Sequence, residues 1–432
     1  MKIAVVPDIH LNKTVFKGVM DRDISDLPFR NVDFMKAFAW AVDKNISEIK
    51  PDLFVIPGDI YDHPDPSNKV RRFFSKQLRK LNKADIPVII LIGNHDVSKR
   101  EHAISDIFEL QLPKTVVIEK PTINTYKGVK LLLFPYSLEV EQKKKTIKQD
   151  FTDFVDEIHK QKLDMPSIFF GHFGVKGASM NQYTEEEVID QMGQVGELTD
   201  TVTKITAEVK HEFINNNPKD ISLDDLDGIG AEYVMLGDYH KHQVLPTKKC
   251  IAMYPGSLEK TNALEADLEK GFVVFDSEAK PDKKMGKCQF IVYPNCRPMI
   301  EINGTLSKIR ENFKKLDPDK YKGAIVKLGF HGTKDELIDF SSGLETLKRE
   351  IRDTLNPIHV YNQNDVIDEE QREAATKLET EILKKGHLEA EDVIDCVKEM
   401  LEERIKDEKE KKLTIDLTVE EYEEYKEAKK NK

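Results

Sequence analysis

The sequence predicts an α/β protein with buried strands, and two observations support this prediction. First, short apolar runs alternate with segments of helical apolar spacing; the runs are 2–7, 52–57 and 86–92, and the helical segments are 31–48 and 68–83. Second, residues 298–361 repeat the alternation in the order β-α-β-α-β. This second pattern predicts a small additional α/β unit.

The length and the changes in composition predict more than one domain. A chain of 432 residues is too long for one compact core. We expect a first domain over 1–285, because the stretch 276–287 is rich in Lys, Pro, Asp and Gly, and a second over 297–368. Residues 369–432 are dense in Glu and Lys with spaced apolar residues, which predicts exposed amphipathic helices.

Within the first domain, further strands are expected at 130–134, 167–170, 233–236, 251–254 and 271–275. Residues 183–214 are longer than the architecture needs and resemble polar helices. Three interpretations remain open for this segment: an inserted lid, a partner surface or a solvated surface helix.

Composition excludes several classes of protein. Hydrophobic residues make up 39% of the chain, too many for a disordered protein. There is no apolar run of about twenty residues, so we expect no membrane span, and the apolar N-terminal stretch is too short for a signal peptide. The net charge of −12 argues against non-specific coating of nucleic acid. The four cysteines lack C-x-x-C spacing, and we expect a soluble cytoplasmic or nucleoid-associated protein with reduced thiols.

Five polar motifs follow predicted strands. They are Asp8-Ile9-His10, Gly58-Asp59-Ile60-Tyr61-Asp62, Gly93-Asn94-His95-Asp96, Gly171-His172 and Gly237-Asp238-Tyr239-His240. In open α/β sheets, ligand sites collect at the carboxyl ends of strands, so the five motifs are expected to converge.

The residue types suit divalent metal ions. Asp, Asn and His supply oxygen and nitrogen ligands, and no thiolate is among them. A carboxylate such as Asp59 can bridge two cations, and two cations about 3.5–4 Å apart clamp a phosphate and stabilise the attacking and leaving oxygens. Each motif alone also has a structural interpretation: Asp59 and Asp96 as helix N-caps, His172 and His240 as satisfied buried histidines. Their joint order favours the metal site.

In order and spacing these motifs resemble those of the calcineurin-like metallophosphoesterases. They are most similar to the SbcD branch, the nuclease subunit that pairs with an SbcC-type ATPase in DNA double-strand-break repair. Three segments add to the resemblance: Gly171-His172-Phe173, Leu236 to Gln243, and the Tyr254-Pro255-Gly256-Ser257 element. Residues 297–368 resemble the DNA-capping domain of that branch. The resemblance implies a four-layer sandwich of two mixed β-sheets flanked by helices, followed by a small α/β capping domain and a helical C-terminal tail that binds the partner.

The resemblance also implies roles for individual residues. Seven would bind two divalent ions, Mn²⁺ or Mg²⁺: Asp8, His10 and His240 the first, Asn94, His172 and Asp238 the second, with Asp59 bridging both. His95 would face the phosphate and protonate the leaving oxygen, with Asp96 orienting it. Asp62 occupies the place of a second phosphate-facing histidine in some relatives.

One position departs from the family pattern. The usual final motif is G-H-x-H, and this chain has Gly237-Asp238-Tyr239-His240. A carboxylate still binds a hard cation such as Mn²⁺, although it lowers the positive charge of the site. The alternative is that His242 enters the site instead, with a shift in register.

The favoured function is a two-metal DNA exonuclease or endonuclease that acts as a homodimer with an SbcC-type ATPase carrying a coiled coil. A basic helix could meet backbone phosphates through Lys69, Arg71, Arg72 and Lys76, or it could be a solvated helix face. Two rivals remain open: a phosphatase or phosphodiesterase with the same metal core, and a scaffold whose site is impaired by Asp238.

Overall fold

The computed structural model describes residues 1–13, 16, 19–21, 27–97, 112–161, 165–176, 178 and 221–366. The predicted insertion 183–214 and the predicted tail 369–432 lie outside these residues. No helix in the described ranges is long and apolar enough to cross a membrane.

The first sheet has six strands in the order β12-β11-β1-β2-β3-β4. Their bounds are β1 Lys2–Val5, β2 Leu53–Pro57, β3 Val88–Leu91, β4 Thr115–Ile118, β11 Gly271–Asp276 and β12 Cys288–Val292. Strands β1 to β4 pair in parallel, and β11 and β12 join antiparallel at the β1 edge.

The second sheet has the order β5-β6-β7-β8-β10-β9. Its strands are β5 Thr122–Tyr126, β6 Val129–Phe134, β7 Ser167–His172, β8 Tyr233–Gly237, β9 Gln243–Val244 and β10 Ile251–Tyr254. Pairing is parallel from β6 through β7 and β8 to β10, and antiparallel at both edges.

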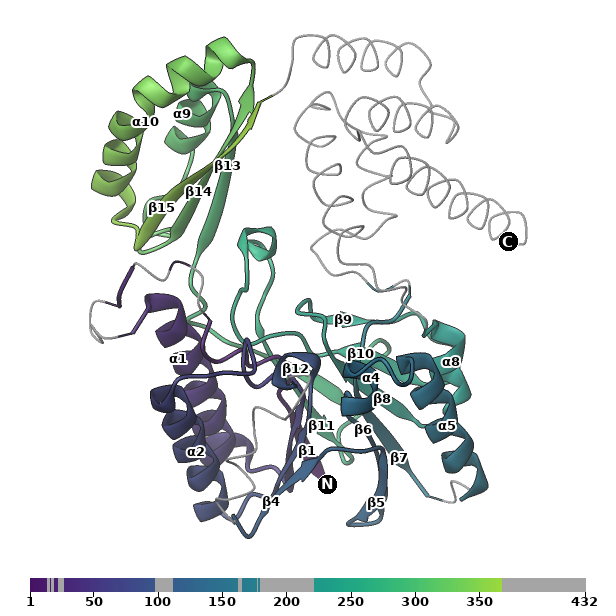
Figure 1. The fold of residues 1–432 in the computed structure, drawn as a ribbon. Helices are drawn as coiled ribbons and strands as arrows, with labels where there is room; N and C mark the ends of the chain where they lie inside the picture. The colour runs from purple at the N-terminus through teal and green to yellow at the C-terminus, as the bar shows by residue number, and fades with distance from the viewer. Residues whose placement is uncertain are drawn as a thin grey trace, which may run out of the picture.

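Two sheets and two groups of helices form four layers (Figure 1). Helices α1 Phe29–Lys44 and α2 Asn68–Lys83 cover the first sheet, and α5 Ile147–Lys160 and α8 Leu223–Gly228 cover the second. A short helix, α4 Leu138–Glu141, precedes α5. The layered mixed α/β architecture confirms the predicted fold class.

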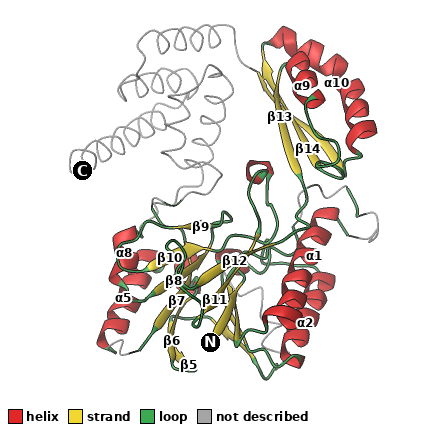
Figure 2. Ribbon diagram, turned by 180° about the vertical axis from the view of Figure 1, so that it is seen from behind, coloured by secondary structure: helices red, strands yellow, loops and turns green. Residues whose placement is uncertain are grey.

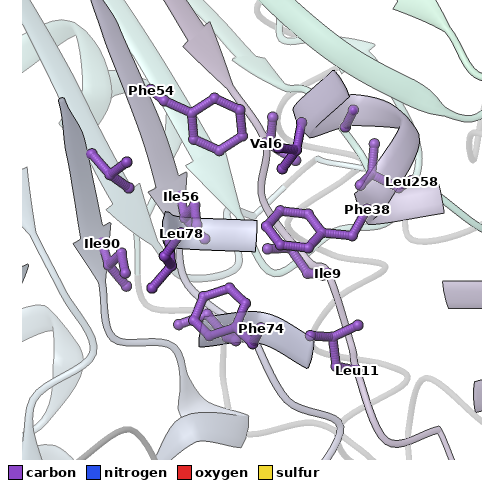
Figure 3. Packing of buried hydrophobic residues seen from close by; sticks show 14 of the residues in the cluster. Val6, Ile9, Leu11, Phe38, Phe54, Ile56, Phe74, Leu78, Ile90 and Leu258 are labelled. Carbon is purple, nitrogen blue, oxygen red and sulfur yellow. The ribbon is translucent and has the colours of Figure 1, made fainter. Parts of the chain in front are cut away.

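Alternating strand residues fill the space on both sides of each sheet. Val5 and Val55 point toward Leu131 and Phe170 in the core between the sheets. Ile56 of β2 and Ile90 of β3 point the other way, and they meet Phe38 of α1 and Phe74 of α2 (Figure 3). The period of two in a strand therefore lets one apolar run build two cores.

The second unit is a three-stranded parallel sheet with helices on one face (Figure 2). Its elements are β13 Met299–Gly304, α9 Leu306–Lys314, β14 Ile325–Gly332, α10 Lys334–Leu355 and β15 His359–Val366. This is the β-α-β-α-β order that the sequence predicts, with its own core around Leu328, Phe330 and Phe340.

The predicted boundary at residue 285 is wrong in one respect. Strand β12 pairs with β11, so the first sheet continues to Val292. The polar stretch near Asp282 is a turn between these two antiparallel strands, closed by Asp282 and Gly286, rather than a linker between domains. Turns and linkers share the same composition, which explains the error.

Candidate metal centre

The loops after β1 and β2 continue side by side beyond the ends of the strands. The Asp8 amide donates to the Gly58 carbonyl at 3.2 Å, and the His10 amide donates to the Asp59 carbonyl at 3.0 Å. Leu11 and Tyr61 then form an isolated bridge. This backbone ladder places Asp8 and His10 beside Asp59, as expected from the shared edge of parallel strands.

Four of the predicted metal ligands have backbone angles that L-residues rarely adopt. The φ angles are 50° at Asp8, 45° at His10, 53° at Asp59 and 105° at Asp238. Positive φ costs on the order of 1–3 kcal/mol per residue and persists where surrounding structure enforces it, which is typical of functional sites.

Asp8, His10 and His240 form the first group of candidate ligands, with ligand atoms within 4.8 Å of one another. The Nε2 atoms of His10 and His240 lie 2.9 Å apart. The Nδ1 atom of His240 lies 3.1 Å from both Glu265 Oε1 and Thr261 Oγ1. Because Nδ1 has these partners, Nε2 is the nitrogen left to bind a metal ion.

Asp59, His172 and Asn94 form the second group. Nε2 of His172 lies 3.2 Å from Asp59 Oδ1 and 2.9 Å from Asn94 Oδ1, while its Nδ1 lies 2.7 Å from the Pro57 carbonyl oxygen. The carbonyl holds the proton on Nδ1 and leaves Nε2 directed at the two oxygens. Asp59 also lies 3.7 Å from His10 Nε2, so it stands between the two groups.

These residues fit a pair of divalent cations. Asp8, Asp59 and His172 are almost fully buried, and Asp8 Oδ2 has no hydrogen-bond partner within the described ranges. A buried carboxylate oxygen without a partner is costly, and a bound cation would satisfy it. The oxygen and imidazole donors suit Mn²⁺, Mg²⁺ or similar ions, and the identity of the metal is not fixed by them.

Burial and close charges shift the pKa values in the centre. Burial raises the pKa of Asp8 to about 7, although the charges of His172 and His240 act in the opposite direction. Burial also opposes ionisation of Asp59, but the charge and hydrogen bond of His172, together with the charges of His95 and His10, outweigh it and hold the Asp59 pKa well below its usual range. Burial disfavours a charged His172, yet Asp59 raises the pKa of His172 to about 10. The cluster is therefore a strongly coupled charge centre.

His95 is half-buried beside these groups. Its amide donates to Asp59 Oδ1 at 3.0 Å, and its Nδ1 lies 2.7 Å from the Asp62 carbonyl oxygen. Its ring meets the His10 ring edge-on, with centroids 5.1 Å apart. Since the carbonyl occupies Nδ1, the Nε2 atom is left to face a substrate.

Asp96 does not contact the His95 ring, although the family resemblance implies that Asp96 orients it. Its carboxylate accepts the backbone N–H groups of Ile60 and Tyr61 at 3.0 and 3.1 Å and that of Gly93 at 3.0 Å. The Asp62 carbonyl, not the Asp96 carboxylate, is the partner of the His95 ring. Asp96 therefore ties the loop after β2 to the loop after β3, because three buried donors converge on it.

The Asp62 carboxylate is paired with Lys13. Lys13 Nζ lies 2.6 Å from Asp62 Oδ1, and the same oxygen lies 3.5 Å from His10 Nδ1. Asp62 thus contacts two residues of the centre: its carboxylate lies near the His10 ring, and its carbonyl oxygen lies near the His95 ring. The lysine offsets the carboxylate charge at the edge of the site.

Asp238 lies close to the centre but outside both ligand groups. Its amide donates to Asp8 Oδ1 at 3.0 Å, and burial raises the pKa of its carboxyl while the charge of His172 opposes that shift. The register shift that would bring in His242 does not occur. The His242 ring stacks on Phe290 at 4.0 Å, and its Nδ1 lies 3.1 Å from the Tyr254 carbonyl oxygen.

The four basic residues proposed for DNA contact lie on α2. Lys69, Arg72 and Lys76 are exposed, and Arg71 is half-buried with its Nε donating to the Pro66 carbonyl at 3.2 Å. The helix begins at Asn68, six positions after Asp62, so its first turn is close to the centre along the chain.

Sequence reasoning missed the groups that support the ligands. Thr261 and Glu265 meet His240, Lys270 meets Glu265 at 2.6 Å, and Lys13 meets Asp62. None belongs to a motif that follows a strand. The one available signal is the position of Lys13, three residues after His10 in the same loop.

Residues 1–202 match the family model of the calcineurin-like phosphoesterases. With the layered fold and the converged Asp, Asn and His side chains, this match establishes a calcineurin-like phosphoesterase domain. Such a domain indicates a metal-dependent phosphoesterase, a hydrolase.

Two curated relatives match shorter segments, and both are named DNA double-strand break repair protein Mre11. The Methanococcus maripaludis protein is 34% identical over 76 residues, 18% of this chain and 20% of that protein. The Sulfurisphaera tokodaii protein is 32% identical over 103 residues, 24% of each. The chain therefore matches less than a quarter of the length of either. The crystal structure of TT1561 from Thermus thermophilus is 14% identical, covering 64% of this chain and 93% of that one, with a TM-score of 0.35.

Proposed function

We propose that the chain is a two-metal-dependent DNA nuclease that acts with an SbcC-type ATPase in DNA end processing. The observation that carries the proposal is the convergence of Asp8, His10, Asp59, His172 and His240, with His95 held beside them. The partial similarity to two proteins named for double-strand break repair supports DNA as the substrate.

The geometry suggests separate roles for the cations, His95 and Lys13. Two bound cations would clamp the phosphate and supply hydroxide near neutral pH. His95 presents Nε2, because Nδ1 is held by the Asp62 carbonyl oxygen. It can therefore hold a proton for the leaving oxygen of the phosphodiester. Lys13 offsets the Asp62 charge, so that this carboxylate repels an incoming phosphate less.

Substrate DNA would extend beyond the centre. We assign contacts with backbone phosphates to the basic residues of α2, Lys69, Arg71, Arg72 and Lys76, and a capping role to residues 297–368. The exposed positions of Lys69, Arg72 and Lys76 suit such contacts. The homodimer and the ATPase with its coiled coil belong to the proposal through the SbcD resemblance. Light scattering of the purified chain, alone and mixed with an SbcC-type ATPase, tests both.

The experiment for the nuclease is cleavage of end-labelled linear DNA by the full chain in the presence of Mn²⁺. We expect metal-dependent cleavage that His95→Ala abolishes and that His159→Ala, at an exposed histidine of α5, leaves unchanged. Hydrolysis of bis-p-nitrophenyl phosphate without DNA cleavage would instead assign a non-nuclease phosphodiesterase. Absence of bound metal together with absence of both activities would assign a non-catalytic scaffold.

A further inference from the structure

A fully buried ion pair lies behind His240. Lys270 Nζ stands 2.6 Å from Glu265 Oε2, and the exposed fractions of the two side chains are 0% and 2%. Buried ion pairs contribute little net stability, because desolvation offsets most of the attraction. The contacts that this pair makes with its neighbours therefore matter more than its own attraction.

The carboxylate of Glu265 is saturated with donors. Its Oε1 lies 3.1 Å from His240 Nδ1 and also accepts the Thr261 hydroxyl. Its Oε2 accepts the Thr261 amide at 2.9 Å in addition to Lys270. These bonds fix the carboxylate in one orientation, with one oxygen directed at the imidazole ring.

Lys270 holds the backbone of the same histidine. Its ammonium donates to the His240 carbonyl oxygen at 2.9 Å and to Ser257 Oγ at 3.0 Å. The pair therefore contacts His240 at two places: Glu265 bonds to the ring, and Lys270 bonds to the main-chain carbonyl. Both the direction of the ring and the position of its backbone are thereby fixed by the same two side chains.

The loop that carries Thr261 and Glu265 is anchored at its other end. Glu259, 1% exposed, accepts the Lys260 amide at 2.9 Å and the Arg297 amide at 3.1 Å. Ser257 Oγ donates to the Glu259 carbonyl at 2.8 Å. The support for His240 is thus itself rigid, as precise orientation of a ligand requires.

We propose that Glu265 and Lys270 are positioning residues that hold His240 with its proton on Nδ1 and its Nε2 directed at the first metal ion. The inference rests on the proposed metal-dependent function. A carboxylate on the far nitrogen of a ligating histidine fixes the tautomer and the ring and makes the ligand more basic. Loss of this support typically lowers metal affinity by about tenfold to a hundredfold.

The test is calorimetric titration of the metal-free full chain with Mn²⁺. We expect two bound ions in the wild type, and in Glu265→Gln one of them weakened by about tenfold to a hundredfold. The matched control is Glu269→Gln, which removes the same charge from an exposed position of the same loop and should bind as the wild type does. Wild-type affinity for both ions in Glu265→Gln would overturn the inference.

A second variant separates the loss of positioning from misfolding caused by an unpaired buried charge. Glu265→Gln leaves Lys270 buried without its anion, whereas Glu265→Gln/Lys270→Met removes both charges and avoids an unpaired one. We expect the double variant to fold and to show the same weakened site, and wild-type binding would overturn the inference. Nitrogen NMR of metal-free protein adds a direct readout, since His240 should be protonated at Nδ1 in the wild type and lose this preference in the variants. If the wild type itself bound no Mn²⁺, the proposed function would fail together with the inference.

Discussion

Asp33 and Arg297 form a bidentate ion pair between α1 and the start of the second unit. Arg297 Nε lies 2.6 Å from Asp33 Oδ2, and Nη2 lies 2.5 Å from Oδ1. Arg30 Nη1 reaches the same carboxylate at 2.7 Å, and Arg297 Nη1 donates to the Gly323 carbonyl at 2.9 Å. The Arg297 guanidinium also lies over the Phe29 ring. Asp33 therefore pairs with two arginines at the junction of the two units, and Glu259 Oε1 lies a further 3.8 Å from Arg30 Nη1.

Removal of this carboxylate should be strongly destabilising. Asp33→Ala leaves the fully buried Arg30 and the mostly buried Arg297 without their shared anion, which costs about 3–5 kcal/mol. Urea unfolding followed by fluorescence of Trp40, the single tryptophan, measures the loss. Asp43→Ala is the control, because Asp43 is an exposed residue of the same helix paired with Lys80, and it should cost less than about 1 kcal/mol. Equal losses in the two variants would contradict the prediction.

The strands and the converging motifs could be predicted from sequence because both are local signals. The apolar run ending at Asp8 and the run ending at Gly58 are short and uninterrupted, and parallel pairing then brings their ends together. The predicted helix 68–83 matches α2 at both ends: the regular spacing of Val70 and Phe74 indicates the helix, and in the structure Ser67 caps its start. Most of the ligand set follows from this.

The supports of the site could not be predicted in the same way. Glu265 lies 25 residues from His240, and Arg297 lies 264 residues from Asp33. An isolated glutamate or arginine in a charged sequence has no periodicity that marks it as buried. Its partner becomes known only when the sheet order brings distant loops together. The same reason explains Asp96, whose three backbone donors come from two loops.

Asp96 should contribute stability as well as loop geometry. Asp96→Ala leaves three buried N–H groups, those of Ile60, Tyr61 and Gly93, without an acceptor. Each unsatisfied donor costs about 1–3 kcal/mol, so we expect a loss of about 3 kcal/mol or more. Asp96→Asn keeps one acceptor oxygen and should lose less. Urea unfolding of the metal-free variants measures both, and an alanine variant no less stable than the asparagine variant would refute the argument.

Gly237 is predicted to be essential for the second ligand group. A Cβ at this position would lie 2.2 Å from the Pro57 carbonyl oxygen and 2.6 Å from His172 Nδ1, across the hydrogen bond that orients His172. We therefore expect Gly237→Ala to weaken Mn²⁺ binding by at least about tenfold, as loss of ligand orientation does. Gly228→Ala, where a Cβ would meet nothing within 4 Å, is the control. Titration of both variants with Mn²⁺ is the measurement. An unchanged Mn²⁺ affinity in Gly237→Ala would contradict the prediction and show that the backbone at residue 237 can shift to accept the methyl group.

The role of Asp238 can be separated from its backbone strain. Its φ of 105° is poorly tolerated by most side chains, but asparagine accepts positive φ about as well as aspartate does. Asp238→Asn therefore removes the charge while leaving the turn intact. A unit charge about 4 Å from a cation is worth about 4 kcal/mol at an effective dielectric of 20, so loss of this neighbouring carboxylate charge should weaken the second Mn²⁺ by at least about tenfold. Calorimetric titration measures the change against Asp224→Asn, at an exposed aspartate of α8. Undiminished binding in Asp238→Asn would mean that Asn94, His172 and Asp59 hold the second ion without it.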